Sequence, residues 1–414
     1  MTLPQVNSAR LMETLETLGR IGETPEGMQR LAFTPADVEG RRYVMDLMAR
    51  AGLKVRVDPA GNIIGRIEGT KPGLPAIALG SHTDTVPGGG KYDGALGVLA
   101  SIEALQTLQD LSLSPIHPVE VLDFTNEEGT SYRRWLYGSR AMSGLLEDAD
   151  LKAVDDEGVP IGDRLKDVGG DITRIQQAVR CPGDLCAYLE LHIEQGPTLQ
   201  QNQIPVGIVT AITGRVALEV SVVGVANHAG TTPMNSRRDA LLASSSLIQA
   251  VSAIAAEEEI CRVGTVGMVK VSPGAENVIP GRVDFSVEFR DVDMQRLIQA
   301  GRRFRGLCQS IMLTSDVEVY VNEVGVTQPQ AMCPRLSQAI HGAAQKLSLL
   351  TASLPSGAGH DAQSMAKITD AAMIFVPSVD GVSHSPLEYS DPQACVNGAN
   401  VLLHTLLTLD ETLD

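Results

Sequence analysis

The side chains best suited to chemistry lie in a glycine-rich stretch, residues 80–97, that contains His82, Asp84 and Asp93. An imidazole and two carboxylates offer the nitrogen and oxygen donors that divalent metals such as zinc and manganese take. The apolar run directly before it, residues 74–79, predicts a buried strand. Because ligands collect at the carboxyl ends of strands in open α/β sheets, we expect a metal site where this strand ends.

Three further apolar runs also end in metal-ligating residue types. These runs are 118–124 before Glu127 and Glu128, 185–191 before His192, and 371–377 before His384. Each motif alone is weak, since a lone histidine or acidic pair is more often structural than functional. Their joint occurrence after apolar runs and beside glycine or proline turns favours one shared site.

The donor set is large enough for two cations. Asp93 can bridge them through its two oxygens, with His82 and His192 completing one site and Glu128 and His384 the other. Paired metals of this kind lie about 3.5–4 Å apart and share a water or hydroxide. The residue types accept zinc, manganese, cobalt or nickel and select none of them.

Two acidic residues are expected to act beside the metals. Asp84 can accept the free N–H of the His82 imidazole and fix its tautomer. Glu127, next to a ligand and held ionised by the nearby cations, can take a proton from the attacking water as a general base. The alternative for Glu127 is a carboxylate that only supports the ligands.

The surrounding pattern predicts an α/β fold in two domains. Strand-like and helix-like segments alternate through the first part of the chain, which indicates a mixed sheet flanked by helices. From about residue 212 the order becomes β-α-β-β-α-β, the ferredoxin-like arrangement. We therefore expect residues 212–326 to form an inserted domain, and residues 1–211 and 327–414 to form a discontinuous catalytic domain.

Composition narrows the possible partners. Among 414 residues the formal net charge is −17, which disfavours nucleic acid and anionic membranes. The six cysteines form no CxxC pair, and no apolar run reaches membrane-spanning length. With no secretory leader at the start of the sequence, we expect a cytoplasmic protein.

The order of the motifs HTD, YDGALG, NEEG, ELHIEQGP, NHAGTTPM, NVIPGRV…FRD, SGAGHDA and GVSHSP resembles the hydantoinase/carbamoylase family of dinuclear metallo-amidases. The resemblance runs from near the first residues to the last predicted helix. It implies two divalent metal ions, the same five ligands, and Glu127 as the base. It also implies a homodimer built through the inserted domain, which closes over the metals as a lid.

The resemblance adds substrate-binding residues that the pattern alone does not single out. They are Gln195, His228, Asn277, Arg290, Gly359 and His360. Chemically, Arg290 can hold a substrate carboxylate, and His228 can act in catalysis by donating to an oxyanion. The alternatives are an arginine paired with acidic neighbours and a turn histidine with local hydrogen bonds. Residues 130–135 depart from the family pattern and are expected to reshape the pocket.

These features predict a hydrolase for the ureido C–N bond of N-carbamoyl-L-amino acids, giving the amino acid, ammonia and carbon dioxide. The alternative is an allantoate amidohydrolase, which uses the same chemistry on a related small ureido carboxylate. An aminoacylase or dipeptidase is less expected. A non-catalytic binding protein on the same scaffold is opposed by the complete ligand set and by Glu127.

Overall fold

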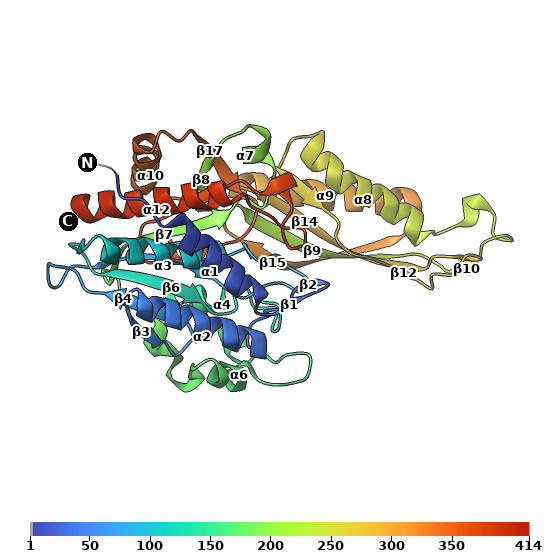
Figure 1. Ribbon diagram of the computed structural model, residues 1–414. Helices are drawn as coiled ribbons and strands as arrows, with labels where there is room; N and C mark the ends of the chain where they lie inside the picture. The colour runs from blue at the N-terminus through green and yellow to red at the C-terminus, as the bar shows by residue number, and fades with distance from the viewer. Residues whose placement is uncertain (1–2, 414) are drawn as a thin grey trace. The chain divides into compact units, whose positions relative to one another are not determined.

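The computed structural model describes residues 3–413 and divides the chain into two compact units. The first unit ends at Thr210 and resumes at Met332, and the second is Ala211–Ala331. Figure 1 follows the chain through both units. Within the described residues, no helix has the length and apolar character needed to cross a membrane.

The first unit contains most of a nine-stranded sheet, of which the edge strand Gln330–Ala331 and the last two residues of Val206–Ile212 fall within residues 211–331. Its four central strands are parallel neighbours in the order β18 (Ala371–Val376), β7 (Leu185–Ile193), β5 (Ala76–His82) and β6 (Val119–Phe124). They are almost entirely buried, which explains why the sequence shows continuous apolar runs instead of alternation. The outer strands are β4 (Ile63–Ile67) and β3 (Lys54–Val57) beyond β6, and β8 (Val206–Ile212), β16 (Gln330–Ala331) and β17 (Thr351–Ser356) beyond β18.

Helices cover this sheet, as the sequence predicted. The long ones are α1 (Ser8–Arg20), α2 (Pro35–Arg50), α3 (Ala95–Asp110), α10 (Pro334–Lys346) and α12 (Pro392–Thr412). Helix α3 packs on β5 and β7 and is enclosed by α1, α2 and α12, so nearly all of its residues are buried. In Figure 1 these helices lie together along the sheet. The prediction of a mixed sheet flanked by helices is confirmed.

Short elements fill the connections of the first unit. Between β6 and β7 lie α4 (Tyr137–Met142), α5 (Asp148–Leu151), α6 (Ile161–Asp167) and η1 (Ile172–Ala178). These bury a small core of their own that includes Tyr137, Ile161 and Leu165. The other short elements are β1 (Glu23–Thr24), β2 (Gly27–Met28), α7 (Thr198–Gln201), α11 (Asp361–Met365) and η3 (Val379–Gly381).

The second unit contains an antiparallel sheet in the order β11-β14-β9-β15, with β12 also paired to β14. The elements along the chain are β9 (Gly214–Val223), α8 (Ala240–Ala256), β11 (Val263–Thr265), β12 (Val269–Ser272), β14 (Arg282–Asp291), α9 (Met294–Ser315) and β15 (Glu318–Thr327). A two-stranded ribbon of β10 (Asn227–His228) and β13 (Val278–Ile279) is separate from this sheet. The alternating side chains of β9 and β14 pack against α8 and α9 to form the core of the unit. A lid or dimerisation role for it stays a prediction.

Helix α3 approaches β7 very closely at Gly97. A β-carbon on Gly97 would overlap the carbonyl oxygen of Leu191 and lie 2.8 Å from the β-carbon of Ser81. Only a residue without a side chain fits between the helix and the strand at this point. The contact matters because α3 follows Asp93 directly, while Ser81 and Leu191 precede His82 and His192.

We predict that Gly97→Ala lowers the free energy of unfolding by about 1–3 kcal/mol or more, because overpacking a tight contact forces the backbone apart. Urea denaturation of the metal-free protein measures this. The matched control is Gly342→Ala in α10, where a β-carbon would meet no atom within 4 Å. That change should raise stability by roughly 0.5–1 kcal/mol, since glycine is unfavourable inside a helix. A Gly97→Ala protein as stable as the wild type would contradict the close packing.

Candidate metal centre

The carboxyl ends of the four central strands bring the predicted ligands to one edge of the sheet. Strand β5 ends at His82, and His192 is the penultimate residue of β7. Glu128 follows β6, and His384 follows β18 after a short 3-10 turn. Because the strands are parallel neighbours, all four of these segments meet at the same edge.

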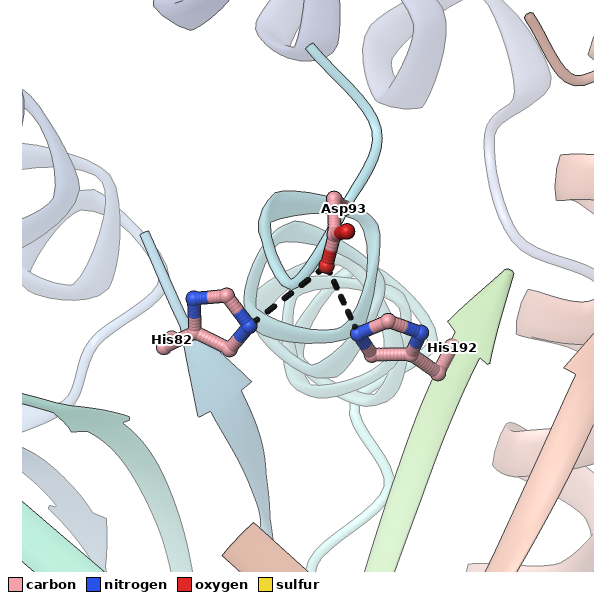
Figure 2. Close-up of side chains that lie close together, drawn as sticks. All are labelled: His82, Asp93 and His192. Carbon is pink, nitrogen blue, oxygen red and sulfur yellow. Dashed lines mark ion pairs between the residues drawn. The ribbon is translucent and has the colours of Figure 1, made fainter. Parts of the chain in front are cut away.

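Asp93 lies at the centre of this group, just before the first turn of α3. Its Oδ1 atom is 3.6 Å from Nε2 of His82 and 3.1 Å from Nε2 of His192, as Figure 2 shows. Its Oδ2 atom is 3.2 Å from Nε2 of His384. The same His384 nitrogen is 3.4 Å from Oε1 of Glu128. The two oxygens of Asp93 therefore face two different sets of donors.

These distances fit metal coordination. Donor atoms bound at 2.0–2.2 Å to a tetrahedral ion lie roughly 3.3–3.6 Å from one another. The ligand atoms of His82, Asp93 and His192 lie within 4.8 Å of one another, as do those of Asp93, Glu128 and His384. The contacts of Asp93 with the three histidines are 3.1–3.6 Å long. These side chains therefore suit divalent metal ions.

The imidazole tautomers also call for a cation. Nδ1 of His82 is 3.0 Å from the carbonyl oxygen of Asp84, and Nδ1 of His192 is 2.9 Å from the carbonyl oxygen of Ile193. A carbonyl can only accept, so each Nδ1 carries the proton, and Nε2 of a neutral ring has a lone pair. That of His192 accepts the backbone N–H of Gly94 at 3.2 Å, and both Nε2 atoms lie in contact with the Asp93 carboxylate. That contact is repulsive unless positive charge lies there. Accordingly, the neighbouring carboxylates raise the pKa of His82 and His192 against the effect of their burial.

Asp84 has a different role from the one expected. Its Oδ1 is 3.7 Å from Nδ1 of His82, which is too far for a hydrogen bond. The backbone carbonyl of Asp84 accepts the hydrogen bond from this N–H instead. The carboxylate accepts the backbone N–H groups of Glu127 at 3.1 Å and Glu128 at 3.2 Å. Asp84 therefore fixes the imidazole with its main chain and the Glu127–Glu128 turn with its side chain.

Glu127 lies beside the cluster, with Oε2 at 3.7 Å from Nε2 of His82. Burial raises the pKa of Glu127 well above its usual range, and the charge of Glu128 adds to this shift. Burial likewise raises the pKa of Glu128 to about 7. Glu127 was expected to be ionised, and in this environment its ionisation depends on positive charge being supplied to the site.

Gln195 contacts the cluster directly. Its Nε2 donates to Oδ2 of Asp93 at 2.7 Å and approaches the hydroxyl of Ser383 at 3.3 Å. Its Oε1 is buried and has no hydrogen-bond partner among residues 3–413. An unpartnered acceptor at this position suits an N–H donor from a bound molecule. The substrate contact of Gln195 remains a prediction, and Oε1 is the atom that could make it.

His360 is placed against a predicted ligand rather than at an open surface. Its ring is only 2% exposed and packs on that of His192, with centroids 4.5 Å apart. Its Nε2 is 2.8 Å from the hydroxyl of Ser356. Burial lowers the pKa of His360 well below its usual range, so the ring is neutral. His360 is therefore placed to support the ring of His192. Substrate contacts of His360 and of its neighbour Gly359 stay predictions.

Sequence reasoning missed three side chains of this site. Glu190, two residues before His192 on β7, accepts from the hydroxyl of Ser81 and the backbone of Ala362, at 2.8 Å each. Ser383 and Glu388 lie in the segment around His384 and bond to the Asp93 loop. Glu190 could have been found because alternate residues of a strand share one face with His192. No signal marks Ser383 or Glu388 beyond their closeness to His384.

The remaining predicted residues belong to the second unit, where they separate into two groups. His228 and Asn277 lie together in the β10–β13 ribbon, where the N–H of Ala229 donates to the carbonyl of Asn277 at 2.9 Å. Arg290 lies near the far end of β14, whose first residue, Arg282, is the one nearest the ribbon. With about 3.3 Å of rise per residue, the part of β14 from Arg282 to Arg290 spans roughly 25 Å. One small molecule cannot contact both groups within a single copy of this unit.

His228 makes local hydrogen bonds in a turn, and Arg290 is paired with an acidic neighbour, as in the alternatives to a substrate-binding role. Nδ1 of His228 accepts the backbone N–H of Gly230 at 3.0 Å, which leaves Nε2 as the protonated, exposed nitrogen of the neutral ring. Nε of Arg290 forms an ion pair with Glu288 at 2.6 Å, and Glu288 lies two residues before it on β14. His228 thus presents a donor, and Arg290 has a carboxylate partner already.

The loop that departs from the family pattern, residues 130–135, closes the Glu127 turn. The N–H of Leu136, directly after it, donates to the carbonyl of Glu127 at 2.7 Å. Trp135 is 54% exposed. The loop therefore lies next to the cluster, and its effect on the pocket stays a prediction.

Comparison with known proteins gives a consistent result. A family model described as Peptidase family M20/M25/M40 matches residues 78–408, a range that includes all five predicted ligands. An N-carbamoyl-L-amino acid amidohydrolase from Geobacillus stearothermophilus is 41% identical over 98% of this chain and 99% of its own. An allantoate amidohydrolase from Bacillus subtilis is 36% identical over 96% of this chain and 97% of its own.

A solved structure shows the same fold over the whole chain. The amidase of the hydantoinase/carbamoylase family from Burkholderia multivorans has a TM-score of 0.90 and 36% identity, with 98% of both chains covered. The resemblance inferred from the motifs is thereby confirmed. The chain belongs to Peptidase family M20/M25/M40 and, within it, to the hydantoinase/carbamoylase amidases.

Proposed function

We propose that this protein is a metal-dependent amidohydrolase that cleaves the ureido C–N bond of N-carbamoyl-L-amino acids. The observation that carries the proposal is the position of Asp93, whose two oxygens face separate imidazole and carboxylate donors while Glu127 lies alongside. The similarity to an N-carbamoyl-L-amino acid amidohydrolase over the full chain supports the substrate class.

In this proposal Asp93 would hold two divalent ions, one together with His82 and His192 and the other together with Glu128 and His384. When bound, such a pair polarises the scissile carbonyl and makes a water molecule more acidic. The carbonyl oxygens of Asp84 and Ile193 keep both Nδ1 atoms protonated, so that Nε2 is the nitrogen that each ring would offer to an ion. In His192 this nitrogen also accepts the backbone N–H of Gly94 at 3.2 Å. Zinc, manganese, cobalt and nickel all suit these donors.

The remaining side chains handle protons and orient the substrate. Glu127 accepts a proton from the attacking water and passes it to the departing nitrogen of the amino acid. The carbamate released in this way breaks down to ammonia and carbon dioxide. Gln195 accepts an N–H of the ureido group through its buried Oε1. Arg290 holds the substrate carboxylate, and Nε2 of His228 donates to the oxyanion.

Allantoate hydrolysis is the second candidate, favoured by the similarity to the Bacillus subtilis allantoate amidohydrolase. Both substrates carry a carboxylate and a ureido group, so the same residues serve either. An aminoacylase or dipeptidase would not need an acceptor for a ureido N–H. A purely binding role would not need a general base, whereas Glu127 lies beside the ligands with Oε2 at 3.7 Å from Nε2 of His82.

We further propose that the active form is a homodimer in which two copies complete each site. The support is the separation of roughly 25 Å along β14 between Arg290 and the His228–Asn277 ribbon. A small ureido carboxylate cannot span that distance, so contact with both groups requires a second copy of the chain. The cytoplasmic location inferred from the sequence stays a prediction.

The substrate class is tested by comparing kcat/KM for N-carbamoyl-L-methionine, allantoate and N-acetyl-L-methionine on protein loaded with a single metal. We expect the first to be turned over best. Preference for allantoate would select the second candidate. Turnover of the N-acetyl compound alone would contradict the ureido assignment, because it would place the protein with the aminoacylases.

For the general base, we predict that Glu127→Gln lowers kcat by about 10²–10⁴-fold, the usual contribution of such a group. The amide keeps the size and the backbone position of the residue but cannot take a proton. Metal content, measured by mass spectrometry of the purified protein, should equal that of the wild type. A variant with the wild-type rate would remove Glu127 from the chemistry.

The shared site predicts complementation between inactive variants. A heterodimer purified from co-expressed, differently tagged Arg290→Ala and His228→Ala chains has one site free of both changes, and should regain about half of wild-type activity. The matched control pairs His228→Ala with Asn277→Ala. These residues lie together in one ribbon, so every site of that heterodimer carries one defect and stays inactive. No regain in the first heterodimer would show that one chain supplies all three residues.

A further inference from the structure

Glu388 fixes the main chain around Asp93 from a distant part of the sequence. It is 5% exposed, and its Oε1 accepts the backbone N–H of Tyr92 at 3.0 Å and of Asp93 at 3.1 Å. The packing is tight, since a β-carbon on Gly90 would overlap the Glu388 side chain. The residue that bridges the two donor groups is therefore held in place by a carboxylate that is not itself one of the donors.

The second oxygen of Glu388 reaches Asp93 by another route, through Ser383. The hydroxyl of Ser383 is 2.8 Å from Oε2 of Glu388 and 3.1 Å from Oδ2 of Asp93. It has only one proton, so it can donate to one of these carboxylates at a time. Glu388 lies closer and competes for that proton. Asp93 Oδ2 already accepts from Gln195 at 2.7 Å, and it also faces His384.

We propose that Glu388 is a positioning residue for the metal centre, which acts on Asp93 in two ways. It anchors the backbone of Asp93 through two N–H groups. Its Oε2 also accepts the hydrogen bond that the Ser383 hydroxyl donates. This leaves a lone pair of Asp93 Oδ2 free for the cation shared with His384 and Glu128. The inference rests on the proposed metal-dependent function and names residues outside the ligand set.

The informative change is Glu388→Gln, because it separates these two actions. The amide oxygen can keep both backbone hydrogen bonds only if the amide nitrogen faces Ser383. That nitrogen then donates to the Ser383 hydroxyl, which must turn its own proton toward Asp93 Oδ2. Asp93 would accept a second hydrogen bond on the oxygen meant for the metal. The loop stays anchored while the metal ligand becomes weaker.

We expect Glu388→Gln to bind Zn²⁺ about 10–100-fold more weakly than the wild type, the usual effect of altering a hydrogen-bond partner of a ligand. Competition with a chromophoric chelator measures this without any substrate. Adding Ser383→Ala removes the misdirected proton, so the double variant should bind Zn²⁺ more tightly than Glu388→Gln alone. The two variants share the same residue at position 388, so their difference reports on the proton rather than on packing.

The control is Glu103→Gln in α3, a buried carboxylate ten residues after Asp93 that accepts the backbone N–H of Asn7 at 2.8 Å and pairs with Arg10 at 2.6 Å. Its Zn²⁺ affinity should equal that of the wild type. Wild-type affinity in Glu388→Gln, or a double variant that binds as weakly as Glu388→Gln, would overturn the inference. A wild-type protein that binds no Zn²⁺, Mn²⁺, Co²⁺ or Ni²⁺ would instead contradict the proposed function.

Discussion

The structure of this site depends on one carboxylate between two groups of donors. The oxygens of Asp93 face imidazole nitrogens on both sides, at 3.1 Å for His192 and 3.2 Å for His384. Backbone carbonyls fix the tautomers of His82 and His192 so that lone pairs point at this carboxylate. Negative charge and lone pairs gathered in a buried place need positive charge to offset them, and the proposed metal ions would supply it.

The fold supplies this geometry through parallel strands and a closely packed helix. Four neighbouring strands end at one edge, and α3 begins just after Asp93 and lies against β5 and β7. A second set of carboxylates then shapes the loops. Asp84 accepts the backbone of the Glu127–Glu128 turn, and Glu388 accepts the backbone of Tyr92 and Asp93. In both cases the acid acts on main-chain N–H groups, so its role is to hold the residues that do the chemistry.

The sequence predicted the mixed sheet because the buried strands appear as apolar runs, and it offered candidate ligands because chemistry-bearing residues follow those runs. It predicted the wrong partner for His82, since a spacing of two residues does not distinguish the carboxylate of Asp84 from its carbonyl. Glu388 and Ser383 could not be predicted, because a hydrogen bond across 295 positions leaves no local pattern. The separation of Arg290 from Asn277 could have been noticed, since the first eight residues of β14 lie between them. The resemblance grouped these residues by role and said nothing of distance.

Counting the metal ions bound by the wild type and by Asp93→Ala tests the central claim most directly. Mass spectrometry of protein purified without chelators and then equilibrated with Zn²⁺ gives the count. If Asp93 bridges two ions, the wild type holds two per chain and Asp93→Ala loses tight binding of both, while His384→Ala loses only one. An Asp93→Ala protein that still holds two ions, or a wild type that holds none, would contradict the account.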